Sequence, residues 1–328
     1  MLSTNETRIV KAILNNKNEI KSNHTSLGNY YDFIFLCGGE KYEKDNRSML
    51  VQHINKSKKR SSLYSEDLFS FLKDIDLLTF EEILLEISTA VIIILESWGS
   101  ACELGAFSYV NSNIDKLLVI NDIKHKDSQS FINDGPLRKI EKHSEKKKRV
   151  FFEKFIDNKP RNTLVISSEL SDEIDNIQPK KTFKSATFNV TASKTIEILD
   201  ISYLMWLIVD IIKIFGTIKK KNTYTLILNI FEVETIILRT SAENTISNQN
   251  EVRNIIDFLI TVLLKFKLIK EVKDNCTLNL SFLRQNGVKV KEFSSVLFKE
   301  SFLRTRNAIK MKAEILNKAK KDGYIIWE

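Results

Sequence analysis

The sequence has only 3 prolines, 3 cysteines and 4 histidines among its 328 residues. The cysteines, Cys37, Cys102 and Cys276, lie far apart, form no C-x-x-C pair and have no histidines close to them in the chain. A disulfide framework and a zinc site are therefore not indicated, and we expect no resident metal or cofactor. The histidines form no compact triad pattern, so serine-type hydrolysis is not expected either.

The signature motifs of several enzyme classes are also missing. G-x-G-x-x-G, the P-loop lysine motif and H-E-x-x-H do not occur. The sequence therefore has none of the usual signals for dinucleotide reduction, P-loop hydrolysis of nucleotides or zinc proteolysis. The first residues have no apolar core of a signal peptide. The apolar run at 204–214 is too short and too charged to span a bilayer, which needs about 18 or more apolar residues. We expect a cytoplasmic protein without a membrane anchor.

The composition is that of a soluble globular protein, with 43% hydrophobic and 28% charged residues. A chain of this length accommodates two domains, each with its own core. The net charge of +8 suits a polyanionic partner, and it suits a merely solvated basic surface equally well.

The first half of the chain predicts an α/β fold. Continuous apolar runs at 32–37, 90–95 and 116–121 have the length of strands, and strands without alternation are typical of a parallel sheet with helices on both faces. Segments 80–87 and 102–110 have the spacing of helices that pack on a sheet. We therefore predict a Rossmann-like parallel sheet flanked by helices.

The second half predicts a mainly helical, winged-helix-like domain. An apolar stripe runs along 251–267, and two short strands, 268–272 and 276–280, follow it around a turn. The predicted organisation is a catalytic domain at 1–166, a linker at 167–195 and the helical domain at 196–328.

One stretch of the first half has the features of a ligand site. Glu96 directly follows the apolar run at 90–95 and precedes a predicted helix. In open α/β sheets, ligands bind beyond the carboxyl ends of the strands. Ser97, Gly99 and Ser100 would offer backbone N–H groups and hydroxyls to a phosphate or ribose oxygen there. We expect Glu103 in the first turn of that helix, directed toward the same crevice.

A purely structural interpretation of this stretch remains open. Ser100 and Glu103 have the S-x-x-E spacing of a capping box, in which the glutamate only reaches back to the serine amide. Against this, a carboxylate at a helix N-terminus is suited to staying ionised, and an ionised carboxylate beside a sugar can attack or stabilise an anomeric carbon.

Further candidate binding residues follow other strands of the first half, and each has a structural alternative. A tight turn would explain Gly38 and Gly39, and a helix N-cap would explain Ser65 or Asp67. A turn before a helix would explain Asn133, and a lysine partner would explain Glu96. The candidates are Cys37, Gly38 and Gly39 after the first strand, Tyr64, Glu66 and Asp67 after a short second strand, and Asn133 after the strand at 116–121.

Four blocks, 35–39, 64–69, 95–108 and 130–136, together resemble the effector protein of bacterial retrons. The N-terminal domain of that effector is similar to nucleoside deoxyribosyltransferases. The resemblance implies an N-glycosidase site in which Glu103, the glutamate of the S-x-x-E-L-G block, is the nucleophile. The transferases usually carry an aspartate in the turn before this glutamate, whereas this chain has Glu96 at the strand end.

The resemblance also implies a biological setting. It suggests an antiviral toxin that is restrained by a reverse transcriptase and its branched RNA–DNA product, and that depletes a nucleotide pool, with NAD as the leading substrate. Related transferases complete their sites with a neighbouring subunit, so a homodimer or a higher assembly is expected.

The chemistry of the N-glycosidic bond indicates which catalytic groups the site needs. Cleavage of an N-glycosidic bond passes through an oxocarbenium-like state that a nearby carboxylate stabilises or captures. Nicotinamide leaves a cationic ring as a neutral base and needs no general acid, whereas a purine needs one, for which Glu66 and Asp67 are candidates. Two other functions stay open: a module that senses a nucleotide without cleaving it, and a DNA-binding regulator.

Overall fold

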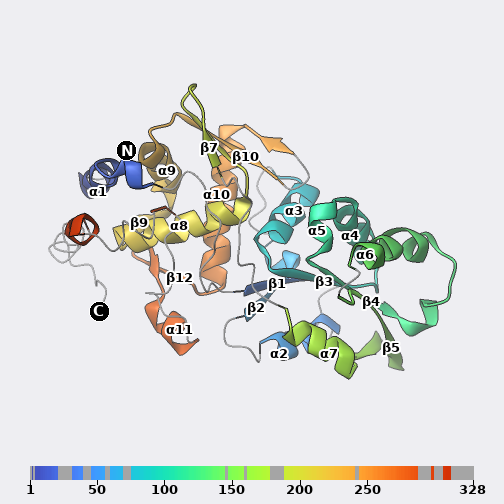
Figure 1. Ribbon diagram of the computed structural model, residues 1–328. Coiled ribbons are helices and arrows are strands. Elements are labelled where there is room, and N and C mark those ends of the chain that lie inside the picture. Colours follow the sequence, from blue (N-terminus) through green and yellow to red (C-terminus); the bar gives the residue numbers. More distant parts are fainter. Residues whose placement is uncertain are drawn as a thin grey trace. The chain divides into compact units, whose positions relative to one another are not determined.

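The computed structural model of the chain (Figure 1) divides into two compact units. The sheet unit comprises Tyr31–Ser70 and Asp76–Pro179, and the helical unit comprises Met1–Tyr30, Phe71–Ile75 and Lys180–Glu328. The structure describes residues 2, 4–20, 32–39, 46–55, 60–68, 75–144, 147–158, 161–177, 188–240, 244–286, 297–298 and 306–311.

The sheet unit is built on a six-stranded sheet with the order β2-β1-β3-β4-β5-β6. The first five strands in this order run parallel, and β6 pairs antiparallel with β5 at the edge. The predicted parallel sheet flanked by helices is therefore confirmed, with an antiparallel edge strand added. The strands are β1 (Asp32–Cys37), β2 (Arg60–Leu63), β3 (Ala90–Ile94), β4 (Leu117–Asp122), β5 (Val150–Asn158) and β6 (Arg161–Val165).

Helices cover both faces of this sheet, as Figure 1 shows. Helices α2 and α7 lie on one face, where their apolar residues form one core with Ile34 and Leu36 of β1. Helices α3 and α4 lie on the other face, where the ring of Phe107 packs 6.2 Å from that of Phe35. The helical segments are α2 (Asn46–Ile54), η2 (Ser65–Asp67), α3 (Leu77–Ile87), α4 (Trp98–Tyr109), α5 (Asn111–Ile114), η4 (Ile123–His125), η5 (Asn133–Leu137), α6 (Arg138–His143) and α7 (Ser168–Asp175).

The strands β1, β3 and β4 are buried along their whole length. Because successive side chains of a strand point to opposite faces, Ile34 and Leu36 meet α2 and α7, and Phe35 and Cys37 face the α3 and α4 side. This alternation explains why the apolar runs of the sequence are continuous, and it fixes which side chain reaches which side of the sheet.

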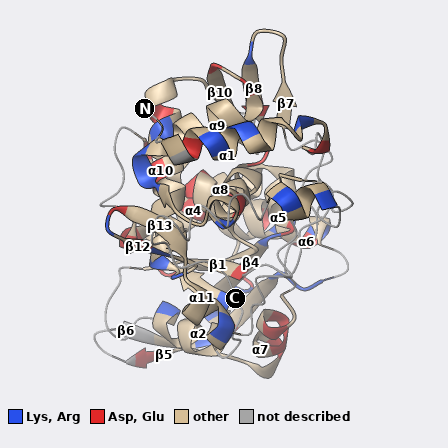
Figure 2. Cartoon of the chain, turned by 90° about the vertical axis from the view of Figure 1, so that its left-hand side faces the viewer, with Lys and Arg blue, Asp and Glu red and all other residues tan. Residues whose placement is uncertain are grey.

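Helix α7 corrects the predicted linker at 167–195. Ser167 caps the helix by accepting a hydrogen bond from the Leu170 amide, and Leu170 and Ile174 are buried in the core of the sheet unit. The residues at 188–190 and 195–198 form strands of the helical unit. The sequence of this segment is polar because α7 exposes an acidic face, red in Figure 2, while only two of its residues are buried.

The same acidic face pairs with two basic residues that precede β5. Lys148 forms an ion pair with Glu169 at 2.6 Å, and Arg149 forms one with Glu173 at 3.3 Å. These cations of the segment that leads into β5 are therefore matched within the sheet unit and are not free for a polyanionic partner.

The helical unit combines helices with two small sheets, ordered β11-β10-β8-β7 and β12-β13-β9. Helix α8 is buried on nearly all sides, so the apolar run at 204–214 is a core helix, as an all-round hydrophobic helix must be. The elements are α1 (Thr4–Leu14), η1 (Lys17–Glu19), β7 (Phe188–Val190), β8 (Thr195–Ile198), α8 (Ile201–Phe215), β9 (Ile218–Lys219), η6 (Lys220–Asn222), α9 (Thr223–Phe231), β10 (Thr235–Arg239), β11 (Thr245–Ile246), α10 (Gln249–Lys265), β12 (Ile269–Val272), β13 (Asn275–Leu278) and α11 (Leu280–Gln285).

The predicted helix followed by a hairpin is confirmed. Helix α10 is followed by β12 and β13, which pair antiparallel. Lys273 and Asp274 form the turn, and both have positive φ, as a two-residue hairpin turn of the primed kind requires. A third strand, β9, pairs with β13 from an earlier part of the chain.

The first helix of the chain corrects the predicted domain at 1–166. Helix α1 belongs to the helical unit, where Glu6 is buried and both its carboxylate oxygens accept hydrogen bonds from Asn222 at 2.9 and 3.0 Å. Val10 and Ile13 of the same helix are buried. Within the part of the chain that the structure describes, no helix combines the length and the apolar character that crossing a membrane requires.

Candidate functional site

The order of the strands defines where a ligand site is expected in the sheet unit. In the order 2-1-3-4-5, chain connections leave β1 and β3 toward opposite faces, and ligands bind at this switch point, beyond the carboxyl ends of the two strands. Cys37, Gly38 and Gly39 end β1, and Glu96 and Ser97 follow β3. The predicted residues of both strand ends thus lie at the switch point.

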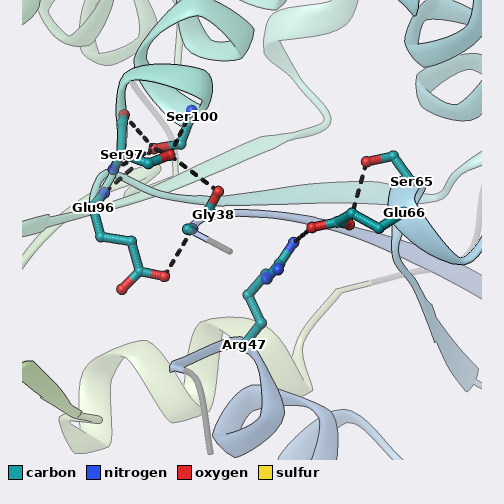
Figure 3. Close-up of polar contacts among 8 residues, drawn as sticks. Gly38, Arg47, Ser65, Glu66, Glu96, Ser97 and Ser100 are labelled. Carbon is teal, nitrogen blue, oxygen red and sulfur yellow. Dashed lines mark hydrogen bonds and ion pairs between the residues drawn. The ribbon is translucent and has the colours of Figure 1, made fainter. Parts of the chain in front are cut away.

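Glu96 binds the scaffold with both of its carboxylate oxygens. One accepts a hydrogen bond from the Gly39 amide at 3.0 Å, and the other accepts one from Asn46 at 2.6 Å. The Asn46 side chain in turn accepts a hydrogen bond from the Leu164 amide of β6. Figure 3 shows Glu96 reaching from the end of β3 toward the end of β1. Glu96 therefore links three segments, and its partner is an asparagine and a backbone amide, in place of the lysine that the sequence left open.

The two glycines after β1 make room for neighbouring side chains. A Cβ atom on Gly38 would lie 3.0 Å from Cδ of Arg47 and 3.1 Å from Oε1 of Glu96, and one on Gly39 would lie 3.2 Å from Cγ of Glu96. Such contacts are too short for ordinary packing. Close approach of Glu96 and Arg47 thus accounts for the glycine pair, while its predicted role in binding a substrate stays a prediction.

Ser97 is the N-cap of α4, which corrects the capping interpretation of Glu103. Oγ of Ser97 accepts a hydrogen bond from the Ser100 amide at 3.1 Å, and Oγ of Ser100 accepts one from the Ser97 amide at 3.2 Å. The capping box therefore spans Ser97 and Ser100, and Glu103 has no part in it. Gly99 is exposed in the first turn of α4.

The helix begins at Trp98, so Glu103 lies in the second turn and the expectation of a first-turn position is wrong. The reason is that Ser97 is the N-cap, so the helix begins immediately after the strand. The Ser97 hydroxyl also donates to the Gly38 carbonyl at 3.2 Å, as Figure 3 shows. The shift turns Glu103 away from the backbone amides of the helix end.

Glu103 instead points toward β1. Phe107 lies one turn further along α4 and packs on Phe35, and residues four apart lie on one helix face. Glu103 therefore reaches the level of Cys37, two residues beyond Phe35 on the same side of the strand. The Cys37 thiol and the Glu81 carboxyl group of α3 both lie within hydrogen-bonding reach of Glu103.

This part of the site is poor in hydrogen-bond donors. Oε2 of Glu103 is buried and has no hydrogen-bond partner among the described residues. Burial raises the pKa of Glu103 above its ordinary value, while hydrogen bonds from Cys37 and Glu81 act in the opposite direction. Burial, followed by the charge of Glu103, raises the pKa of Cys37 well above its ordinary value.

Glu81 is the most strongly shifted carboxyl group of the cluster. Burial raises its pKa to about 8, and the nearby charge of Glu103 adds to the effect. With a pKa of about 8, the Glu81 carboxyl group is the member of the pair that carries a proton at neutral pH.

Arg47 is the cation of the site. The side chain is only 2% exposed and forms an ion pair with Glu66 at 2.7 Å, as Figure 3 shows. Its guanidinium also lies 5.0 Å from the centre of the Tyr64 ring, a cation–π distance. The predicted residues Tyr64 and Glu66 are thus joined to the end of β1 through Arg47, and Asp67 closes the short helix η2 beside them.

Asn133 lies in a π-helical turn of the segment before α6. Its amide nitrogen donates to the carbonyl oxygens of His125 and Ser128, each at 2.7 Å. These bonds fix the loop that follows β4. Contact of Asn133 with a substrate stays a prediction.

Sequence reasoning missed three polar residues of the site, namely Asn46, Arg47 and Glu81. For Glu81 a signal was present, because it shares the apolar stripe of α3 with Leu84 and Leu85, where a charged residue is unusual. Asn46 and Arg47 open the helix that follows β1, at the same edge of the sheet. Among the described residues, no cluster of three or more His, Cys, Asp and Glu has the arrangement of a metal site.

The fold and site define an α/β protein with a carboxyl cluster at the switch point of a mainly parallel sheet, an arrangement suited to binding a nucleotide or sugar. A family model described as STM3845 retron effector protein matches residues 43–271, more than half of the chain. The chain therefore belongs to this family of retron effectors, as the sequence blocks had indicated.

Two proteins of Escherichia coli are similar to part of the chain. "Retron Ec86 putative ribosyltransferase/DNA-binding protein" is 41% identical over 118 residues, which cover 34% of this chain and 38% of the relative. "Retron Ec73 putative ribosyltransferase/DNA-binding protein" is 32% identical over 132 residues, which cover 36% and 40%. The aligned parts thus span well under half of the relatives' own length.

Proposed function

We propose that the sheet unit is a catalytic domain similar to nucleoside deoxyribosyltransferases, and that it hydrolyses the N-glycosidic bond of NAD or a related nucleotide. The names of the two relatives, which include ribosyltransferase, support chemistry at a ribose carbon. The observation that carries the proposal is the state of Glu103: the side chain takes no part in capping its helix, and one of its oxygens is buried without a hydrogen-bond partner among the described residues.

The proposed mechanism has two steps. An oxygen of the Glu103 carboxylate attacks C1′ of the ribose, and a C1′–O bond forms as the C1′–N bond breaks. The electron pair of the broken bond moves to the ring nitrogen of nicotinamide, which becomes neutral and leaves without a proton. Water then attacks C1′, its proton passes to a solvent base, and the electron pair of the ester bond returns to Glu103.

NAD is the favoured substrate class because its leaving group needs no acid. The sheet unit offers Glu66 and Asp67 as candidate acids for a purine, but Glu66 is held by Arg47. The partial burial of Glu103 also suits attack on a cationic substrate, because charge attraction is stronger where water is excluded.

The helical unit is proposed to be the part that contacts nucleic acid. The order helix α8, strand β9, helix α9, helix α10 and hairpin β12–β13, with β9 paired to the hairpin, supports a winged-helix assignment, with β10 and β11 inserted before the last helix. The words DNA-binding in the relatives' names point the same way. We propose the retron reverse transcriptase and its RNA–DNA as partners that restrain a cytoplasmic toxin, and a homodimer as the assembly.

The proposal is tested by incubating the purified full chain with NAD, nucleosides and deoxynucleosides, and by measuring free base by chromatography. We expect release of nicotinamide from NAD, and a loss of about 10³-fold or more in the variant Glu103→Gln, because the nucleophile is removed. Glu82→Gln, which changes a partly buried acid on α3, is the matched control and should keep its activity.

Base release by a folded Glu103→Gln protein at the rate of the unmodified chain would contradict the role of Glu103. Binding of NAD without release of any base would instead favour the alternative, a nucleotide-sensing module coupled to a nucleic-acid-binding unit. The two outcomes are separated by measuring binding and turnover on the same preparation.

A further inference from the structure

Glu81 occupies an unusual position for an acidic residue. It lies in the interior of α3 with only 6% of its surface exposed, and α3 packs against β1. Leu84 and Leu85, three and four positions further on, are buried on the same side of the helix. A glutamate on such an apolar stripe is costly for stability unless its carboxyl group has a partner.

The partner of Glu81 is the carboxyl group of Glu103. Helix α4 is held over β1 by the contact between Phe107 and Phe35, and α3 covers the same face of the strand. The two glutamates therefore approach each other above Cys37, and their carboxyl groups lie within hydrogen-bonding reach. Two ionised carboxylates are acceptors only, so a hydrogen bond between them requires one shared proton.

The surroundings decide which residue holds this proton. Glu81 is buried, whereas Glu103 is partly exposed, and Glu81 is faced by Glu103, Glu66 and Ser65, none of which is a cation. Glu103 is also faced by Cys37 and by two charges: the Glu66 carboxylate, which disfavours its ionised form, and the guanidinium of Arg47, which favours it. The burial of Glu81, which raises its pKa to about 8, agrees with this assignment.

We propose that Glu81 is a positioning residue: it donates the shared proton to one oxygen of the Glu103 carboxylate and fixes that carboxylate for attack on the sugar. This inference rests on the proposed role of Glu103. The proton stays on Glu81 while the other oxygen of Glu103 bonds to C1′, and the Glu81 hydroxyl then donates to the carbonyl oxygen of the ester. No proton is consumed, so the step balances without a further acid.

The first test compares pH profiles of kcat for the full chain and the variants Glu81→Gln, Glu81→Ala and Glu82→Gln. In the unmodified chain, activity should fall as the pH rises through about 8, because loss of the Glu81 proton leaves two repelling carboxylates. In Glu81→Gln the amide still donates a hydrogen bond but does not titrate, so this alkaline fall should disappear. Glu82→Gln should keep it.

Glu81→Ala removes the donor and should lower kcat by about 10–100-fold with little change in KM, because a charge-assisted hydrogen bond that holds the nucleophile is lost. An alkaline fall of activity in Glu81→Gln that matches the unmodified chain would overturn the proposal. So would a Glu81→Ala protein with unchanged kcat.

The second test does not depend on activity and follows the thermal midpoint Tm from pH 5 to 9. A carboxyl group whose folded-state pKa is raised from 4.5 to about 8 makes the folded state bind more protons than the unfolded state, so its stabilisation is present at low pH and is lost as the pH rises toward 8. The difference between the Tm of Glu81→Gln and the Tm of the unmodified chain should therefore shift in favour of the variant as the pH rises.

The two tests separate failure of the inference from failure of the proposed function. A chain that releases no base contradicts the N-glycosidase function, and the Tm series then still decides whether Glu81 holds the shared proton. Parallel Tm curves for the unmodified chain, Glu81→Gln and Glu82→Gln would overturn the inference, whatever the chain does to NAD.

Discussion

The carboxyl edge of the sheet has two sides with opposite surroundings. On the side of α2, Glu96 is bound by the Gly39 amide and the Asn46 side chain, both of which are hydrogen-bond donors. On the side of α3 and α4, Glu103 meets Cys37 and Glu81, which are acids, and has one oxygen without a partner among the described residues. Two carboxylates only seven positions apart therefore have different hydrogen-bond partners.

These partners distinguish a carboxylate that holds the scaffold together from one that is available for chemistry. Donors stabilise an ionised carboxylate and fix it in place, so Glu96 acts as a structural link between strand ends. A carboxylate with one buried oxygen and few donors lowers the stability of the folded state, and such unfavourable positions are typical of functional sites. Its removal should therefore not destabilise the protein as removal of a structural residue does.

The largest effect on stability is expected at Glu96. Glu96→Ala removes the acceptor of two hydrogen bonds and should lower the free energy of unfolding by about 2–3 kcal/mol, because the Gly39 amide and Asn46 lose a charged partner. Glu103→Gln should leave the free energy of unfolding unchanged or raise it slightly at pH 8, because it removes a carboxylate whose pKa is raised by burial. Urea unfolding of both variants measures the contrast.

Glu96→Gln keeps one oxygen acceptor and serves as the matched control, with a loss between those of the other two variants. If Glu103→Gln destabilises the protein more than Glu96→Ala does, the assignment of the structural role to Glu96 is wrong and the comparison of the two sides fails.

A smaller effect is expected at Ser97, which lies between the two carboxylates. Ser97→Ala removes the N-cap of α4 and should cost about 1 kcal/mol. Ser97→Thr retains a hydroxyl that can accept from the Ser100 amide, and it should recover most of that loss. Thermal unfolding monitored by circular dichroism suffices for the measurement. Equal stability of Ser97→Ala and the unmodified chain would show that the cap does not determine where α4 begins.

Much of the sheet unit was predictable because its central strands are buried on both faces. β1, β3 and β4 are continuous apolar runs in the sequence, and apolar runs of this length between turn signals are typical of fully buried parallel strands. β5 was missed because its first residues, Val150 and Phe151, directly follow Lys148 and Arg149, two charged residues whose partners lie on α7. Pairing of distant charges is not visible in a local pattern.

The candidate site was predictable only in part. Glu103 was found because a polar segment directly follows a buried strand, and Brändén's rule places ligands there. Glu81 and Arg47 were missed because their importance depends on which helix face meets β1, and that follows from packing between segments that are distant in the sequence. The unit to which α1 belongs was missed for the same reason, since Glu6 binds Asn222 more than two hundred residues away.

Trapping the glycosyl-enzyme intermediate shows whether Glu103 attacks the sugar. An NAD analogue with fluorine at the 2′ position slows formation of the oxocarbenium-like state and hence hydrolysis of the intermediate. After incubation and an acid quench, mass spectrometry of peptides should find the added sugar nucleotide on Glu103, and Glu103→Gln should carry none. An adduct on any other residue, or equal labelling of the two proteins, would contradict the claim.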